Sequence, residues 1–248
     1  MLNLNLKKTL LTFSFLTLLT TFYGFEAREA DTEFMPLEHA EMAARVATAE
    51  YELLAEGDFV ISAYDNLFRH VSGEQGTDWR LMSAIAYHES RFMPDVVSPR
   101  GAKGLMQIMP VVARQFNVPQ EQVLDPRTNV LLANLLLNKI DKTLRLPSGT
   151  PHRDRLSLIL ASYNGGIGHV SDARRLARLH GENPNSWEVV ARYLKQKADP
   201  AVYESELVKY GKFTGSRQTE AYVREVMKRY DFYCNLVENG ADMVAQVK

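Results

Sequence analysis

The 248-residue sequence contains a single cysteine, Cys234, so the chain cannot form an internal disulfide bond. It also lacks an excess of charge of either sign, because 29 Lys and Arg residues stand against 30 Asp and Glu residues. Nucleic-acid-binding domains usually carry a basic surface, and we therefore predict no nucleic-acid partner. Strand-like alternation of apolar and polar residues is nearly absent, and no internal repeat or low-complexity linker is found. These absences favour one helical domain with short flanking segments.

Two common catalytic motifs are missing as well. His88 and Glu89 are adjacent, as in a zinc protease helix, but the position three residues after Glu89 is Phe92 instead of a second His. No Gly-x-Ser-x-Gly turn indicates a Ser-His-Asp hydrolase. The sequence predicts no metal site and no cofactor.

The N-terminal segment has the pattern of a targeting signal. Lys7 and Lys8 precede an apolar run over 10–25 that is interrupted by Thr, Ser and Gly. This run is shorter than the roughly 20 residues that a membrane-spanning helix needs. We interpret residues 1–27 as a signal peptide or an N-terminal anchor, with cleavage favoured over retention. The protein is expected to be exported, and a retained segment would associate it with a membrane.

The rest of the chain is predicted to be helical. Helices are expected over 37–56, 62–71, 79–90, 105–116, 128–143, 155–163, 170–180, 186–194 and 220–236. We divide the chain into an N-terminal helical extension (28–57), a main domain (58–236) and a flexible tail (237–248).

The predicted helix over 79–90 ends with an unusual carboxylate. Asp78 is a suitable N-cap for this helix, and Glu89 continues an apolar face made by Leu81, Met82, Ile85 and Ala86. Burial of a charge is costly unless the charge is paired or neutralised. Partial burial would raise the pKa of Glu89, so that it could donate a proton near neutral pH. The alternative is an acid exposed to solvent at a frayed helix end.

A loop rich in Gly and Pro follows this helix. We expect it to fold back and to bring Ser98 within hydrogen-bonding distance of Glu89, because Gly101 and Gly104 permit backbone conformations that a side chain forbids. Gln107 lies in an apolar run, and a buried amide requires a polar partner. A carboxylic acid in such a partly desolvated cleft is what acid-catalysed cleavage of a glycosidic bond needs.

Four segments carry a resemblance to a known family. They are ESRFMP at 89–94, SPRGAKGLMQIMP at 98–110, LDPRTN at 124–129 and ASYNGG at 161–166. In order and approximate spacing they resemble the signature of lytic transglycosylases, which form glycoside hydrolase family 23 of the lysozyme superfamily. Over residues 60–233 the sequence is most similar to the catalytic module of the membrane-bound lytic murein transglycosylase F type.

Two departures from that type are visible. Its members carry a solute-binding-like domain before the catalytic module, whereas residues 28–57 alone separate the leader from the module here. Many members also have a Glu four residues before a late Tyr-Val pair, and Gln218 occupies that position here, with Glu220 nearby.

The resemblance implies an all-α, lysozyme-like fold of the goose-type lysozyme or SLT kind, with a catalytic cleft. It implies that the substrate is the glycan strand of peptidoglycan in the periplasm or cell envelope, with no obligate protein partner. Glu89 would first protonate the glycosidic oxygen between N-acetylmuramic acid and N-acetylglucosamine. It would then accept the proton of the muramoyl C6 hydroxyl, and the product would be a 1,6-anhydromuramoyl end.

The family also implies a set of substrate-binding residues, namely Ser98, Gln107, Met109, Tyr163, Asn164 and Tyr222. Ser98 would orient Glu89 or contact the acetamido group, and Gln107 would hydrogen-bond the sugar. Tyr163 would hydrogen-bond Glu89 or substrate, although it could also be a core aromatic residue with its hydroxyl as a polar tip. Tyr222 fits core packing and sugar contact equally well.

Two other functions remain open. A goose-type hydrolytic lysozyme shares the fold and the acid, but it would need a carboxylate to hold water. Asp95 and Asp125 are the candidates, and Asp125 before a Pro is more simply a turn or cap residue. A non-catalytic wall-binding module is the other alternative, although such a module would not need Glu89. Three arginines, Arg174, Arg175 and Arg178, form either a solvated helix face or a contact for stem-peptide carboxylates.

Overall fold

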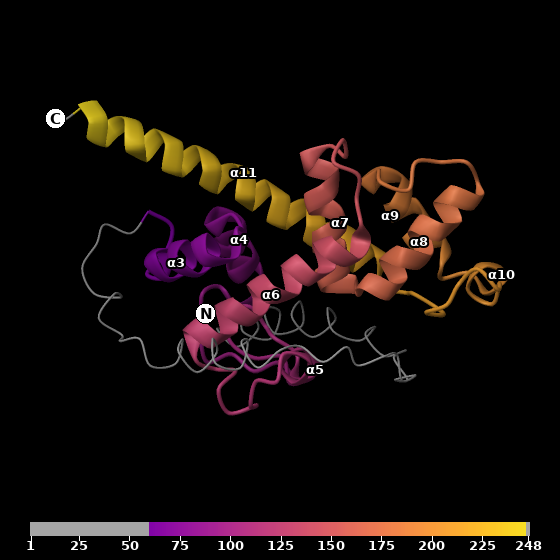
Figure 1. The fold of residues 1–248 in the computed structure, drawn as a ribbon, viewed down its shortest axis with the longest axis horizontal. Helices are drawn as coiled ribbons and strands as arrows, with labels where there is room; N and C mark the ends of the chain where they lie inside the picture. Colours follow the sequence, from indigo (N-terminus) through magenta and orange to yellow (C-terminus); the bar gives the residue numbers. More distant parts are fainter. Residues whose placement is uncertain (1–59, 247–248) are drawn as a thin grey trace, which may run out of the picture. The chain divides into compact units, whose positions relative to one another are not determined.

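The computed structural model describes the backbone of residues 60–246 and the side chains of residues 60–239. This part is helical and contains no strand (Figure 1). Its helices are α3 (Asp65–Gln75), α4 (Trp79–Ser90), α5 (Pro110–Gln115), α6 (Pro126–Leu144), α7 (His152–Gly165), α8 (Ile167–Leu179), α9 (Trp187–Gln196), α10 (Pro200–Tyr203) and α11 (Ser216–Gln246). The all-α prediction is confirmed for these residues. The predicted leader, extension and helix over 37–56 lie outside them.

Most of the predicted helices are present with boundaries that differ by up to four residues, and two boundaries differ by more. Helix α4 has the predicted bounds. The helix predicted over 105–116 is wrong in its first part, because residues 105–107 form a turn, Ile108 pairs with Lys103, and α5 begins only at Pro110. Helix α11 continues to Gln246, ten residues beyond the predicted end at residue 236.

The described residues form two compact units, and the first comprises residues 60–145 and the part of α11 from Val223 onward. Helix α3 packs against α4 and α6, and α5 packs against α6. The core consists of side chains that are almost fully buried, including Phe68, Val71, Met82, Ile85 and Leu132. Burial of such side chains is the main favourable contribution to folding.

Local interactions set the helix boundaries in this unit. The Asp78 carboxylate accepts a hydrogen bond of 2.9 Å from the Arg80 backbone N–H, which confirms the predicted N-cap of α4. At the first residue of α4, the Arg69 guanidinium carbon lies 3.9 Å from the ring centroid of Trp79. The turn before α4 contains Gly76 at φ 69°, a left-handed conformation that glycine adopts at no steric cost.

The second unit comprises residues 146–222, in which α7, α8 and α9 pack against one another. Its core contains Leu158, Leu160, Val170, Ala173 and Leu194. A long-range cap fixes the start of α9, because the backbone N–H of Trp187 donates a hydrogen bond of 2.8 Å to the Asp154 carboxylate on α7.

Within residues 60–246 no helix is both long enough and apolar enough to cross a membrane.

Candidate active site

Glu89 lies on the last turn of α4, and its side chain is half-buried. The preceding residues on its face, Ile85 and Ala86, are fully buried. Directly after the helix, Arg91 and Phe92 adopt φ values of 57° and 61°. Two consecutive non-glycine residues in the left-handed region are uncommon, and such strain often occurs at functional sites. The chain therefore turns sharply immediately after the candidate acid.

The residue after Glu89 connects the end of α4 to the loop that follows. Ser90 is almost fully buried, and its hydroxyl donates a hydrogen bond of 2.9 Å to the carbonyl oxygen of Leu105. The same hydroxyl lies 3.2 Å from the carbonyl oxygen of Ala86, one turn earlier in α4. Ser90 thus fixes the last helical turn, and with it Glu89, against the loop. The sequence analysis did not identify this residue as functional.

The loop is folded by short-range backbone pairing. Lys103 forms isolated antiparallel bridges with Val97 and with Ile108. Ser98 accepts a hydrogen bond of 3.0 Å on its hydroxyl oxygen from the backbone N–H of Ala102. No described residue receives the hydroxyl hydrogen of Ser98, so this half-buried side chain can donate to a ligand or to another side chain.

Gln107 has the polar partners that the sequence analysis required, and both are backbone carbonyls. Its side-chain nitrogen donates hydrogen bonds of 3.1 Å to Val96 and 3.0 Å to Gly104. Since both partners are acceptors, the amide is oriented with nitrogen toward the loop, and Oε1 has no partner among the described residues. Gln107 itself has φ 49°. Met109, the N-cap residue of α5, is half-buried.

Two arginine side chains lie close to the end of α4. The Arg91 and Arg229 guanidinium carbons lie 4.1 and 3.8 Å from the ring centroid of Tyr87, which is typical of cation–π stacking. Burial lowers the pKa of His88, and the charges of Arg91 and Arg229 lower it further against the opposing effect of Glu225. His88, the neighbour of Glu89, is therefore neutral near pH 7.

The other three predicted binding residues lie in the second unit. The Thr219 hydroxyl donates a hydrogen bond of 2.9 Å to Oδ1 of Asn164, which orients this half-buried amide. Tyr163 is half-buried. Tyr222 is only 1% exposed, which is the burial expected for core packing.

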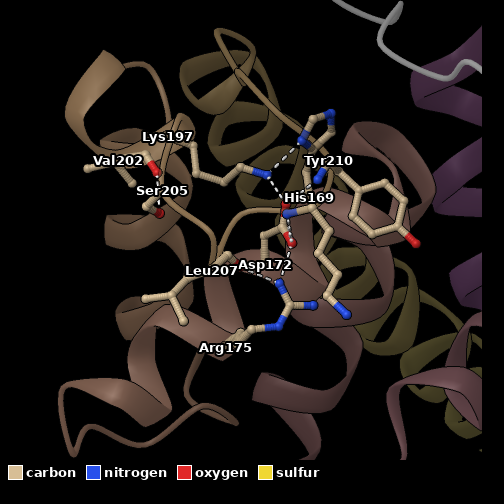
Figure 2. A network of polar contacts seen from close by, with 9 residues as sticks. His169, Asp172, Arg175, Lys197, Val202, Ser205, Leu207 and Tyr210 are labelled. Atoms are coloured by element: carbon tan, nitrogen blue, oxygen red, sulfur yellow. Dashed lines mark hydrogen bonds and ion pairs between the residues drawn. The ribbon is translucent and has the colours of Figure 1, made fainter.

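The second unit also contains a buried ionic network, shown in Figure 2. Lys197 and Asp172 have side chains with 0% exposure and are joined by a contact of 2.6 Å. The Lys197 ammonium also lies 2.9 Å from Nδ1 of His169. Asp172 further accepts hydrogen bonds of 3.0 and 2.9 Å from the backbone N–H groups of Lys209 and Tyr210. The network therefore connects α8 and α9 with the segment that leads to α11.

Two of the three clustered arginines, Arg174 and Arg175, bond to other residues of the second unit. The expectations of a solvated helix face and of a contact for stem-peptide carboxylates were therefore both wrong for them. Arg175 donates to the Asp172 carboxylate at 2.6 Å and to the Leu207 carbonyl at 2.5 Å. Arg174 is 5% exposed and donates to the side chain of Asn185 at 2.7 Å. Only Arg178 is exposed, so the cluster is neither a solvated face nor a set of free cations for a substrate.

The two carboxylates considered for a hydrolytic enzyme, Asp125 and Asp95, lie in a helix cap and in an exposed loop. Asp125 is the N-cap of α6 and accepts a hydrogen bond of 2.8 Å from the backbone N–H of Thr128, so the interpretation as a cap residue is confirmed. Asp95 is exposed in the loop. The part of the chain with described side chains contains no group of three or more His, Cys, Asp or Glu residues that could hold a metal ion.

The structure thus brings Ser98, Gln107 and Met109 together on one loop that is bonded to the end of α4. Sequence reasoning missed Ser90 and Thr219, which orient neighbouring residues through single hydrogen bonds. From the sequence, Asn129 stands out only as the last residue of the LDPRTN motif at 124–129. No pattern in one sequence distinguishes these buried polar residues from other Ser, Thr or Asn residues.

Comparisons with known proteins agree with the motifs. Residues 66–185 match the family model described as the transglycosylase SLT domain. The chain is 38% identical over 168 residues to the membrane-bound lytic murein transglycosylase F of Alcanivorax borkumensis, covering 68% of this chain and 34% of that protein. It is 33% identical over 178 residues to the protein of the same name from Marinobacter nauticus, covering 72% and 34%. The matched part spans about a third of the length of these curated relatives.

Among solved structures, similarity is found to an inactive mutant of the lytic transglycosylase Slt from Pseudomonas aeruginosa. It is 23% identical with a TM-score of 0.49, covering 69% of this chain and 24% of that chain. The 70 kDa soluble lytic transglycosylase of Escherichia coli is 26% identical with a TM-score of 0.46, covering 70% and 24%. On the family match and the curated relatives, this chain carries a transglycosylase SLT domain and belongs to that family.

Proposed function

We propose that this protein is a peptidoglycan lytic transglycosylase that cleaves the β-1,4 bond between N-acetylmuramic acid and N-acetylglucosamine. Glu89 protonates the glycosidic oxygen, and the resulting carboxylate accepts the proton of the muramoyl C6 hydroxyl as that oxygen attacks C1. The C1–O bond to the leaving sugar breaks, and a 1,6-anhydro bond forms without the consumption of water. A tethered nucleophile of this kind can lower a barrier by about 7–11 kcal/mol.

The observation that supports this proposal most directly is the hydrogen bond between Ser90 and Leu105. It joins the helical turn that carries Glu89 to the loop that presents Gln107 and Ser98. On that loop Gln107 offers an oriented acceptor and Ser98 an available donor. A sugar acetamido group needs this combination, since it has one acceptor and one donor.

We assign the remaining residues of the family pattern in the same way. Met109 lines the binding site, and Tyr163 and Asn164 contact the glycan strand, whereas Tyr222, at 1% exposure, packs in the core. The assignment of Asn164 has the best support, because the Thr219 hydroxyl donates to its side-chain oxygen and leaves its two side-chain N–H groups to donate to the glycan. We assign residues 58–236 as the catalytic domain. We also propose that residues 1–27 export the protein, which would act in the periplasm at the cell envelope.

The hydrolytic alternative has less support. A goose-type muramidase would need a carboxylate to position water, and the carboxylate of Asp125 is engaged in capping α6. A non-catalytic wall-binding module would retain the loop but would have no use for Glu89.

Digestion of purified peptidoglycan followed by mass spectrometry tests the proposal. The full chain is expected to release anhydromuramoyl ends, and Glu89→Gln, which keeps the size but loses the acid, is expected to release none. Reducing ends that are heavier by one water would assign a lysozyme instead. Binding without cleavage by either form would assign a wall-binding module.

A further inference from the structure

We infer that Asn129 is a positioning residue for this reaction, because its buried side-chain amide holds the loop that presents Gln107 and Ser98. The inference rests on the proposed function. It concerns a residue on α6 that does not itself reach the substrate, since its side chain has 0% exposure.

The amide of Asn129 bonds to three backbone groups. Its Oδ1 accepts a hydrogen bond of 2.7 Å from the backbone N–H of Met106. Its Nδ2 donates hydrogen bonds of 2.8 Å each to the carbonyl oxygens of Lys103 and Val123. Both hydrogens of the amide nitrogen are thus used, and the orientation of the amide is fixed. Met106 and Lys103 belong to the loop, so one side chain holds it at two points.

Gly104, between these two points, lies directly on the amide. Its φ is 75°, and a Cβ at this position would lie 2.5 Å from Nδ2 and 2.8 Å from Cγ of Asn129. Contacts under 3.0 Å essentially never occur for real Cβ atoms, so an alanine here would force the loop or the amide to move. A glycine and a buried amide are therefore required together.

Asn129 holds Lys103 and Met106, the residues on either side of the turn whose Gly104 carbonyl orients Gln107. The carbonyl oxygen of Gly104 accepts hydrogen bonds from both the backbone N–H (3.1 Å) and the side-chain nitrogen (3.0 Å) of Gln107. Lys103 and Ile108, on either side of this turn, exchange backbone hydrogen bonds of 3.0 and 2.9 Å. Gln107 needs this support because its φ of 49° is unfavourable for a residue with a side chain.

No other side chain of similar size can replace this amide. Asp accepts but, when ionised, does not donate. Leu neither accepts nor donates and would leave three buried backbone groups without partners, which is costly. The requirement for one acceptor and two donors explains why Asn occupies this position.

A matched control exists on the same helix. Asn134 also has 0% exposure, accepts a hydrogen bond from the Thr77 hydroxyl and donates one of 3.0 Å to the carbonyl oxygen of Val130. Its partners lie in the turn before α4 and within α6, away from the 98–109 loop. Asn129→Ala and Asn134→Ala therefore remove the same group from the same helix, but only the first releases the loop.

The experiment compares these two variants of the full chain by hydrogen exchange and by kinetics. Asn129→Ala is expected to lose amide protection in peptides covering 103–108. It is also expected to raise KM for release of anhydromuramoyl ends about ten-fold with a smaller effect on kcat, because Glu89 lies on α4, where the contact of the Ser90 hydroxyl with the Ala86 carbonyl oxygen does not involve the loop. Asn134→Ala is expected to keep both the loop protection and the KM of the wild type. Equal losses in the two variants, or a protected loop in Asn129→Ala, would overturn the inference.

Gly104→Ala gives a second test, because it disturbs the same contact from the side of the loop. The double variant Gly104→Ala/Asn129→Ala is expected to have a KM no higher than the worse single variant, because both changes break one contact. Additive effects would contradict the inference. If the wild type itself releases no anhydromuramoyl ends, the proposed function fails. The affinity of the same variants for soluble glycan strands, with the exchange data, then decides the role of Asn129.

Discussion

Thr219 donates a hydrogen bond of 2.9 Å to the side-chain oxygen of Asn164, and Gly165 allows the two residues to approach. A Cβ on Gly165 would lie 3.0 Å from the Thr219 hydroxyl oxygen, which is tighter than nine in ten contacts of real Cβ atoms. Thr219 is 1% exposed, so water does not compete for this hydrogen bond. The orientation of a proposed substrate-binding amide therefore depends on a residue 55 positions later in the chain.

Replacement of Thr219 by Val tests this dependence, because Val has nearly the same shape and no hydroxyl. We expect a loss of about 1 kcal/mol in the free energy of unfolding from the lost hydrogen bond. We also expect a several-fold rise in KM, because the Asn164 amide is no longer held in one orientation. Thr219→Ser keeps the hydroxyl and should retain the wild-type KM. If the Val and Ser variants bind glycan equally well, Thr219 does not orient Asn164.

Gln107→Gly distinguishes the effect of the Gln107 backbone conformation on stability from the effect of its side chain on glycan binding. Glycine adopts the φ of 49° without a steric penalty, so the free energy of unfolding should change by no more than about 1 kcal/mol despite the lost side-chain hydrogen bonds. Affinity for glycan strands should fall about ten-fold if the amide binds sugar. Arg145→Gly, at φ 46° and exposed at the end of α6, is the control and should not alter affinity. Affinity for glycan strands is measured by isothermal titration calorimetry. All variants carry Glu89→Gln in addition, so that no substrate is cleaved during the measurement.

The buried pair in the second unit should be sensitive to the loss of one charge. Asp172→Asn leaves the Lys197 ammonium buried without its counter-ion, which typically costs about 3–5 kcal/mol. The double variant Asp172→Asn/Lys197→Met removes both charges and should recover part of this loss. Urea denaturation of the single and double variants measures the difference. A double variant that is less stable than Asp172→Asn would show that the ammonium contributes without its partner.

The free energy of unfolding should decrease on acidification because of the lowered pKa of His169. Burial, together with the charge of Lys197 and against the opposing effect of Asp172, lowers the pKa of His169 from 6.5 to about 4. Below pH 6.5 the unfolded chain binds a proton that the folded protein does not accept until about pH 4. The free energy of unfolding should therefore fall between these pH values and not above them. His88, whose pKa is also lowered, adds a contribution of the same sign.

Comparison of wild type with His169→Gln at pH 7.5, 5.5 and 4.5 isolates this effect. The variant should have a smaller slope of unfolding free energy against pH in the acidic range, since one lowered pKa is removed. Equal slopes in the two proteins would assign the acid sensitivity to other groups.

The fold was predictable where the determinants are local. The Asp78 cap and the spacing of Leu81, Met82 and Ile85 specify α4, and its predicted bounds agree with the structure. Residues 105–107 have a helix-compatible sequence but form a turn, because the backbone of Met106 bonds to Asn129, 23 positions later. No local propensity reports such a long-range contact.

The candidate site was only partly predictable for the same reason. The need of Gln107 for a polar partner follows from its apolar surroundings, but the identity of that partner depends on how the loop folds. Arg174 and Arg175 looked like a surface cluster because arginine is usually exposed, and tertiary contacts with Asn185 and Asp172 reversed this expectation. The positions of catalytic side chains relative to one another are likewise a property of tertiary structure.

The placement of the two tryptophans gives each unit its own optical reporter. Trp79 begins α4 beneath the Arg69 guanidinium, and Trp187 begins α9 at the Asp154 cap. Trp79→Phe leaves tryptophan fluorescence only in the unit with the buried Lys197–Asp172 pair, and Trp187→Phe leaves it only in the unit with Glu89. Coincident denaturation curves for the two variants would indicate one cooperative transition, and separate curves would assign a stability to each unit. The natural sequence thus permits the two units to be followed independently without an added label.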